Sequence, residues 1–332
     1  MSKGVKKMNL YMDPEMNHMI ATKQKYGIRI IDKMYLKIYI YIKYIMKVLF
    51  IKSGIHRKNL NFILNCKKIE FTIVNHVNDI YNLNICGYDA VCSPCDTIDV
   101  SKYPNTKFIF GPQFSVFPDD KLMYIKSDKS AYNLLSDWVI NIWSKFALCD
   151  NLRLVKLPFG VDTERFTHNK PNTERSNVIV YFKHRNPIDL HIIENFLIQK
   201  CITYTVFSYD KRYDEQDYIN NLQNSKYCIW VDAHESQGFA LQEALSCNVP
   251  LFVWGVTYMS QEYGQNYDNF LATTTPYWDE KCGEIFYNAD ELQETFNKFI
   301  NNIENYKPRE FILENLSVDA CENRLINFIE NM

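Results

Sequence analysis

Two glutamates with seven residues between them, Glu235 and Glu243, are the residues whose types and spacing best suit chemistry in this sequence. A short helix is predicted to begin at Gly238 and Phe239, which places Glu235 before the helix and Glu243 in its second turn. Glu243 follows Phe239 by four residues and shares its helix face. Both carboxylates can therefore point into one crevice and accept hydrogen bonds from the hydroxyls of a sugar or a ribose.

The start of the same helix suits an anion. Gly238 lets a ligand approach the backbone closely, and the free N–H groups of a helix start attract negative charge such as that of a diphosphate. The ordinary alternative is that Glu235 is a loop residue and Glu243 a helix-surface residue. Against it, the positions around Glu243 are small and apolar, where a carboxylate serves no solubility purpose: Ala240, Leu241, Ala244 and Leu245.

Two apolar runs must position this loop and helix. Lys226–Val231 and Pro250–Trp254 are rich in β-branched and aromatic residues and predict buried strands, and the helix between them ends before Asn248. Strand, helix and strand form a βαβ unit, which places ligands at the carboxyl ends of its strands.

A pair of cations follows a third predicted strand, Asn177–Phe182. Lys183 and Arg185 stand at the carboxyl end of that strand, where two positive charges can neutralise a diphosphate leaving group. A solvated basic turn is the alternative interpretation.

These residues carry a resemblance to a known family. The pattern from Glu235 to Glu243 with its internal Gly-Phe, the continuation EALSCNVP, and the upstream segment 157–166, LPFGVDTERF, resemble the signatures of retaining, nucleotide-sugar-dependent glycosyltransferases of the GT-B fold, family 4 or "glycosyl transferases group 1". The resemblance covers Leu152 to the C-terminus well and Met46–Asn151 loosely. It implies an α/β fold of two Rossmann-like domains that face a central cleft.

The resemblance also implies roles for the charged residues. Glu243 would hold the ribose hydroxyls of a nucleotide-diphosphate sugar, and Glu235 would contact the transferred sugar. Lys183 and Arg185, together with the helix start at Gly238 and Phe239, would bind the diphosphate.

Two further residues are candidates for donor binding by resemblance. His234 would contact the sugar and Gly54 the diphosphate or the acceptor, whereas a histidine satisfied within its turn and an ordinary strand-to-helix turn at Gly54 are the alternatives. The chain departs from the family pattern in having Phe182 instead of a glycine before Lys183, in having no later lysine until Lys200, and in having Gln113 where a cleft histidine is expected.

No Asp-x-Asp motif is present, so the expected reaction needs no metal and no cofactor besides the donor substrate. Retention then requires no protein nucleophile, because the departing phosphate can take the acceptor proton. The predicted function is metal-independent transfer of a sugar from a nucleotide sugar to a glycan, lipid or protein. The alternatives are a catalytically inactive GT-B module that binds nucleotide sugars as a partner subunit, and a GT-B epimerase.

Length and composition bound the remaining expectations. A chain of 332 residues allows two domains, and 37 basic against 39 acidic residues indicate no nucleic-acid partner. The ten cysteines lack the spacing of a disulfide framework, which favours a reduced, cytoplasmic protein with at most peripheral association at a membrane surface.

The expected domains follow from the order of the patterns. Residues 1–45 are expected to be an N-terminal extension outside the fold, with an amphipathic membrane-surface helix as the alternative. Residues 46–157 are expected to form the acceptor-side domain, 158–316 the nucleotide-sugar domain, and 317–332 a helix that packs back toward the first domain. Within the first domain, apolar spacing predicts one helix over Ser130–Lys145 with Ser130 as its N-cap.

Overall fold

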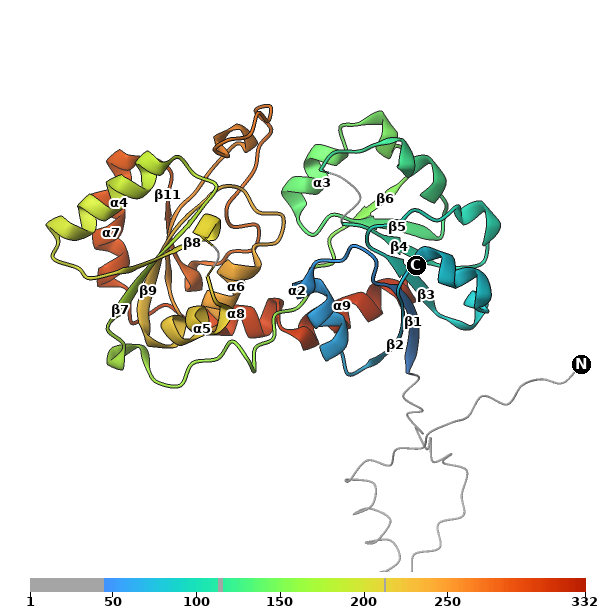
Figure 1. Cartoon of the computed structure of the whole chain (residues 1–332), viewed down its shortest axis with the longest axis horizontal. Coiled ribbons are helices and arrows are strands. Elements are labelled where there is room, and N and C mark those ends of the chain that lie inside the picture. Colours follow the sequence, from blue (N-terminus) through green and yellow to red (C-terminus); the bar gives the residue numbers. More distant parts are fainter. Residues whose placement is uncertain (1–44, 113–115, 212) are drawn as a thin grey trace, which may run out of the picture. The chain divides into compact units, whose positions relative to one another are not determined.

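Two sets of apolar runs form two parallel β-sheets in the computed structural model of the chain, which describes residues 45–112, 116–211 and 213–332 (Figure 1). The expectations for residues 1–44 and for Gln113 lie outside these described residues. The predicted class, α/β with two Rossmann-like sheets, is confirmed by this topology. Within the described residues no helix has the length and apolarity that a membrane span requires.

The first sheet has six strands in the order β2-β1-β3-β4-β5-β6, and its pairs from β1 to β6 are parallel. Its strands are fully or largely buried because their residues are mostly branched or aromatic. The strands are β1 (Met46–Ile51), β2 (Ile69–Val74), β3 (Ala90–Ser93), β4 (Phe108–Phe110), β5 (Ser130–Asn133) and β6 (Arg153–Val155), and the helices that accompany them are α2 (Arg57–Asn65) and α3 (Asp137–Trp143).

The second sheet has five parallel strands in the order β11-β10-β9-β7-β8. Helices α4 and α7 pack together on it, with Phe196 and Phe296 edge to face at 5.0 Å (Figure 1). The strands are β7 (Asn177–Lys183), β8 (Thr205–Ser208), β9 (Ser225–Asp232), β10 (Leu251–Trp254) and β11 (Gly283–Phe286), and the helices are α4 (Pro187–Gln199), α5 (Glu215–Asn224), α6 (Phe239–Ser246), α7 (Leu292–Asn301), α8 (Pro308–Asn315) and α9 (Val318–Glu330).

The predicted helix over Ser130–Lys145 is wrong. Ser130–Asn133 forms the buried strand β5 between β4 and β6, and the helix begins only at Asp137 with Ser136 as its N-cap. Helical spacing misled the prediction because the apolar residues after β5 continue a pattern that the strand itself had begun. Strands β6 and β11 and helix α8 were not predicted, and the apolar run Leu122–Lys126 lies mostly in a 3₁₀ segment, Asp120–Ile125.

The last helix returns to the first sheet. The carboxylate of Glu322 on α9 is buried and accepts the backbone N–H groups of Lys67, Lys68 and Ile69 at 3.1, 2.6 and 2.9 Å, and Lys107 donates to the carbonyl of Ile329 at 2.6 Å. A carboxylate that accepts several backbone donors is a strong anchor. The domain bounds at 157 and 316 stay predictions.

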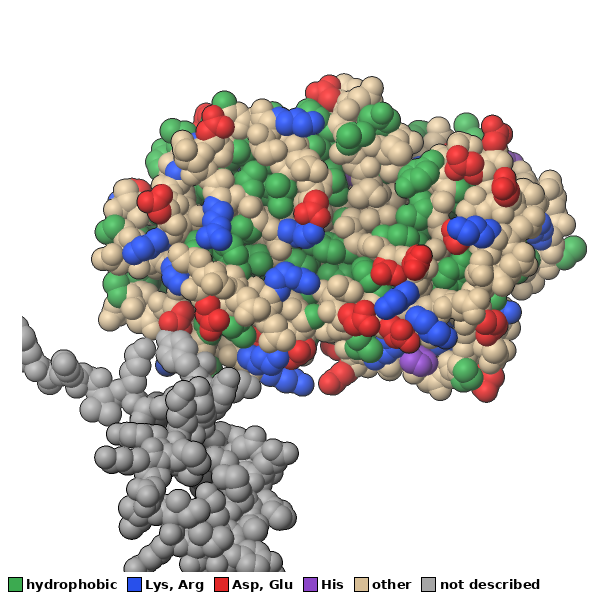
Figure 2. All heavy atoms as spheres, turned by 180° about the vertical axis from the view of Figure 1, so that it is seen from behind, with side chains coloured by type: hydrophobic (Ala, Val, Ile, Leu, Met, Phe, Trp, Pro, Cys, Tyr) green, Lys and Arg blue, Asp and Glu red, His purple; other side chains and the backbone are tan. Residues whose placement is uncertain are grey.

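Charges of both signs are distributed over the surface. On the face shown in Figure 2, Lys and Arg side chains are interspersed with Asp and Glu side chains. This agrees with the near balance of 37 basic and 39 acidic residues.

Gly160, in the segment LPFGVDTERF, lies against the start of α9 and gives a prediction about stability. A Cβ atom at this position would stand 2.5 Å from the Cα of Val318 and 2.8 Å from the carbonyl oxygen of Ser317. Gly160→Ala is expected to lower the free energy of unfolding by about 1–3 kcal/mol, because backbone atoms must move to admit the methyl group. Urea unfolding followed by circular dichroism measures the change.

Gly87→Ala is the matched control, since a Cβ atom at Gly87 meets nothing within 4 Å. It should change the free energy of unfolding by no more than about 0.5 kcal/mol. Equal effects of the two substitutions would contradict the close approach at Gly160.

Candidate active site

A cavity of 1120 Å³ is lined by residues of both sheets. Most of its lining follows the carboxyl ends of parallel strands: His56 after β1, Pro112 after β4, Leu134 after β5, Lys183 at the end of β7 and His234 after β9. The carboxyl ends of open parallel sheets are the usual place for ligands, because loops and helix starts converge there.

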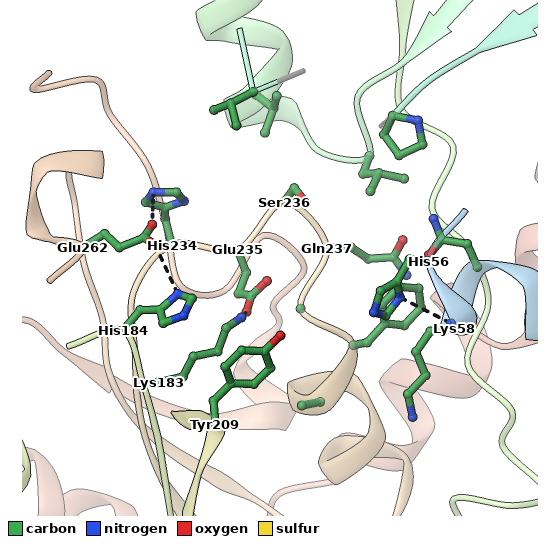
Figure 3. Close-up of a pocket in the computed structure, with 18 of the residues that line it drawn as sticks. His56, Lys58, Lys183, His184, Tyr209, His234, Glu235, Ser236, Gln237 and Glu262 are labelled. Carbon is green, nitrogen blue, oxygen red and sulfur yellow. Dashed lines mark hydrogen bonds and ion pairs between the residues drawn. The ribbon is translucent and has the colours of Figure 1, made fainter. Parts of the chain in front are cut away.

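Glu235 and Lys183 form an ion pair inside this cavity (Figure 3). The ammonium group of Lys183 also lies 5.1 Å from the ring centre of Tyr209. Although burial works in the opposite direction, the carboxylates of Asp232 and Glu235 raise the pKa of Lys183, so this lysine stays charged. Asp232 is almost fully buried behind the pair, and burial raises its pKa.

The backbone of Glu235 is held from two sides. The indole N–H of Trp138, on α3, donates to the carbonyl of Glu235 at 2.9 Å, and the N–H of Glu235 donates to the carbonyl of Thr273 at 3.0 Å. Trp138 therefore both lines the cavity and fixes the loop that carries the glutamate. The sequence predicted Trp138 only as a core residue.

Glu243 lies on α6 with 4% of its surface exposed, and its carboxylate pairs with the ammonium group of Lys58 from the first turn of α2. Burial raises the pKa of Glu243 to about 7, although Lys58 acts against this shift. Lys58 also pairs with Glu215 at the start of α5. One lysine thus joins two carboxylates of the second sheet's helices to a helix of the first sheet.

Glu215 collects further cations. Arg57 and Arg165 approach its carboxylate at 3.0 and 2.7 Å. Burial alone would raise the pKa of Glu215, but Lys58 and the two arginines outweigh burial and lower it. The carboxylate is therefore charged at neutral pH, and it holds the start of α2 against α5.

Gly238 and Phe239 form the predicted helix start. Gly238 is the N-cap of α6 with φ of 79°, a left-handed conformation that glycine adopts without strain. The ring of Phe239 stacks on that of His56, with centroids 6.0 Å apart and an interplanar angle of 17°. Burial, and then Lys58, Arg57 and Lys183, lower the pKa of His56, which keeps this imidazole neutral.

His234 lines the cavity and belongs to a cluster of three residues. Glu262 lies between two imidazoles, with its carboxylate 2.9 Å from Nε2 of His234 and 3.2 Å from Nδ1 of His184 (Figure 3). Both histidines lower the pKa of Glu262 against the effect of its burial. The sequence suggested neither His184 nor Glu262.

Two predicted site residues lie elsewhere. Arg185 does not line the cavity: its guanidinium is buried and donates to the carboxylate of Asp189 at 2.9 Å and to the carbonyls of Asp232 and Trp254 at 3.3 and 2.9 Å. These bonds tie the ends of three segments together, and we therefore drop Arg185 from the site. Gly54 is likewise absent from the cavity lining; a Cβ atom there would meet Sγ of Cys95 at 3.1 Å.

A usable signal for Lys58 was present in the sequence. His56, Arg57 and Lys58 follow β1 and its turn, so the rule that placed Lys183 at the carboxyl end of a strand applies to them too. Their pairing with Glu215 and Glu243 was not predictable, because it joins residues more than 150 positions apart. Among the described residues, no group of three or more His, Cys, Asp or Glu side chains could hold a metal ion.

The shifted pKa of Glu243 gives a prediction about stability and pH. The folded chain keeps a proton on this carboxyl up to a pH of about 7, whereas an ordinary glutamate releases it near 4.5. The folded state therefore binds more protons in this window, and the free energy of unfolding falls as pH rises through it. Glu243→Gln removes this fall, so the variant should gain about 1–3 kcal/mol on wild type between pH of about 5 and 8.

Urea unfolding at the two pH values measures the gain. Glu304→Gln, at an exposed carboxylate, is the control and should follow wild type at both pH values. A difference between Glu243→Gln and wild type that is the same at both pH values would show that Glu243 titrates alike in the folded and unfolded chain.

Comparisons with known proteins concern the architecture. No family model and no curated protein matches the sequence. Among solved structures the chain is similar to WaaG, a glycosyltransferase involved in lipopolysaccharide biosynthesis, at 11% identity and a TM-score of 0.44 over 86% of this chain and 99% of that one. It is also similar to the catalytic domain of starch synthase IV from Arabidopsis thaliana bound to ADP and acarbose, at 11% identity and a TM-score of 0.41 over 76% of this chain and 69% of that one.

Such low identities and TM-scores carry no argument about function. The fold class follows from the chain's own features, which are two parallel sheets and a cavity lined by the ends of both. The chain therefore has the predicted α/β architecture of GT-B type, with two Rossmann-like sheets that share one cavity.

Proposed function

We propose that this chain is a retaining, metal-independent glycosyltransferase that uses a nucleotide-diphosphate sugar. The main support is that Glu235 and Glu243 both line one cavity together with Lys183 and the start of α6. Carboxylates that accept from hydroxyls, beside a lysine and a helix start that bind an anion, match the two kinds of group that a nucleotide sugar carries.

Each group has a place in the proposed donor complex. Glu243 accepts hydrogen bonds from the ribose hydroxyls, which share it with Lys58 or displace that lysine. The diphosphate lies at the N-terminus of α6 beside Lys183, and Glu235 contacts the transferred sugar. His234, held by Glu262, borders the sugar.

The proposed reaction requires no nucleophile from the protein. The bond between the anomeric carbon and the phosphate oxygen breaks, and the acceptor oxygen bonds to the same face of that carbon. The acceptor's proton passes to the departing phosphate oxygen. Lys183 and the N–H groups of α6 stabilise the negative charge that develops on the diphosphate.

Nucleotide binding tests the donor site directly. Isothermal calorimetry with UDP, GDP and ADP should identify one nucleotide that binds, and that nucleotide should raise the melting temperature. Glu243→Gln should weaken its binding about tenfold, because a hydrogen bond to a charged group contributes about 1.5–3 kcal/mol. Inorganic diphosphate should bind wild type and variant equally, since it has no ribose.

Three outcomes of this test are informative. Equal loss of affinity for nucleotide and inorganic diphosphate would contradict the ribose role of Glu243. Binding of none of the nucleotides would overturn the donor site. Tight binding of a nucleotide sugar without hydrolysis or transfer to any of a panel of acceptors would favour the inactive binding module, and isomerisation of the donor would favour the epimerase.

Lys183 is the residue whose loss should affect the reaction rather than donor binding alone. Lys183→Met is expected to lower kcat by about 10²–10³, the usual cost of removing one preorganised group that stabilises charge in the transition state. Steady-state hydrolysis of the nucleotide sugar measures kcat and KM separately.

Lys200→Met is the matched control. Lys200 lies at the C-cap of α4, outside the cavity lining, and its ammonium group lies over the ring of Phe196. Its loss should leave kcat unchanged. An equal loss of kcat in the two variants would transfer the diphosphate role away from Lys183.

A further inference from the structure

One wall of the cavity is apolar, in contrast to the charged residues described so far. This apolar wall consists of Leu134, Leu135, Trp138, Val139, Ile142 and Met259. Five of the six come from the end of β5 and from α3, so one short segment of the first sheet supplies most of the wall. Trp138 and Val139 are the partly exposed members, and the other four are buried with only their edges at the cavity.

The polar atoms of this wall are already engaged within the protein. The indole N–H of Trp138 donates to the carbonyl of Glu235 at 2.9 Å, and the N–H of Leu135 donates to the side chain of Asn133 at 3.1 Å. The carbonyl of Leu135 accepts from the hydroxyl of Tyr277. A sugar laid on this wall would lose the water around its hydroxyls without replacement, which is costly.

Leu135 adds evidence that the wall is built for a purpose. Its φ is 67°, a left-handed conformation that a leucine adopts rarely and at a cost in free energy. The bonds with Asn133 and Tyr277 hold it there from both sides. Glycine would take this conformation without strain, so the leucine side chain itself is what the position requires. Retained strain of this kind gathers at binding sites.

The cavity has room for more than a donor. A single small ligand usually occupies a pocket of about 300–1000 Å³, and this cavity measures 1120 Å³. Its charged side, with Glu235, Glu243 and Lys183, accounts for the proposed donor. The apolar wall faces the remaining space and is continuous with the donor side through Trp138, which contacts Glu235.

We infer that the acceptor carries its reacting hydroxyl on an aliphatic chain, which lies along the apolar wall. Branched aliphatic side chains and a methionine form most of that wall, and such side chains favour a flexible alkyl or prenyl chain over a flat aromatic ring. This inference deepens the proposed function and rests on it for the identity of the site, but the binding of an alkyl chain can be tested without a donor.

Three glucosides that differ only in the aglycone provide the test. Octyl, methyl and phenyl β-D-glucoside are titrated into the full chain by isothermal calorimetry, with octyl glucoside kept below its critical micelle concentration. Octyl glucoside should bind at least about tenfold more tightly than methyl glucoside, since burying even a few CH₂ groups contributes about 0.8 kcal/mol each. Tighter binding of phenyl than of octyl glucoside would overturn the aliphatic assignment.

Two substitutions of Val139 locate the binding. Val139→Asp should weaken the binding of octyl glucoside at least about tenfold by placing a charge in the apolar wall. Val139→Thr, which keeps the shape, should weaken it by a smaller factor, and it keeps the test open if Val139→Asp fails to fold. Asn141→Asp, on the exposed side of α3, is the control and should bind octyl glucoside as wild type does.

The outcomes separate this inference from the proposed function. Octyl glucoside that fails to bind, or that binds Val139→Asp and Val139→Thr as tightly as wild type, would overturn the aliphatic acceptor even if the nucleotide binds. Binding of octyl glucoside at Val139 with no binding of any nucleotide would overturn the glycosyltransferase and leave the apolar site standing.

Discussion

The pairing of Lys58 with Glu243 is the contact on which the site depends. A carboxylate with 4% exposure would be strongly destabilised as an unpaired charge, so α6 can hold Glu243 at the cavity only while a cation lies beside it. Lys58 comes from α2, beside the first sheet, and its second partner is Glu215 on α5. The position of a donor-binding candidate on one sheet is thereby tied to a helix of the other.

The site divides into a charged side and an apolar side, and the same loop serves both. Glu235 pairs with Lys183 through its side chain, while its carbonyl accepts the indole N–H of Trp138. A change in the conformation of this loop must therefore move Trp138 or break its hydrogen bond. Two substrates bound on the two sides would each act on the same backbone segment, so we expect their positions to be interdependent.

Local patterns predicted the elements, and long-range contacts decided the rest. The strands around α6 and the helix start at Gly238 follow from β-branched runs and turn residues, and the structure agrees with them. The segment Ser130–Lys145 failed because β5 is a strand through its neighbours β4 and β6, not through its own spacing. Arg185 failed for a related reason: its buried bonds to Asp232 and Trp254 depend on segments far away in the chain.

Both cavity glutamates are neutralised by lysines before any ligand binds, Glu235 by Lys183 and Glu243 by Lys58. A neutral sugar could satisfy the carboxylates but would leave the displaced ammonium groups without partners. A simple anion could satisfy the lysines but would leave two partly or fully buried carboxylates unpaired. A ligand that brings hydroxyls and negative charge together can satisfy both sets at once, because its hydroxyls donate to the carboxylates while its phosphates face the lysines and the start of α6. The charge arrangement of the empty site thus favours a molecule in which the two kinds of group are covalently joined, as they are in a nucleotide sugar.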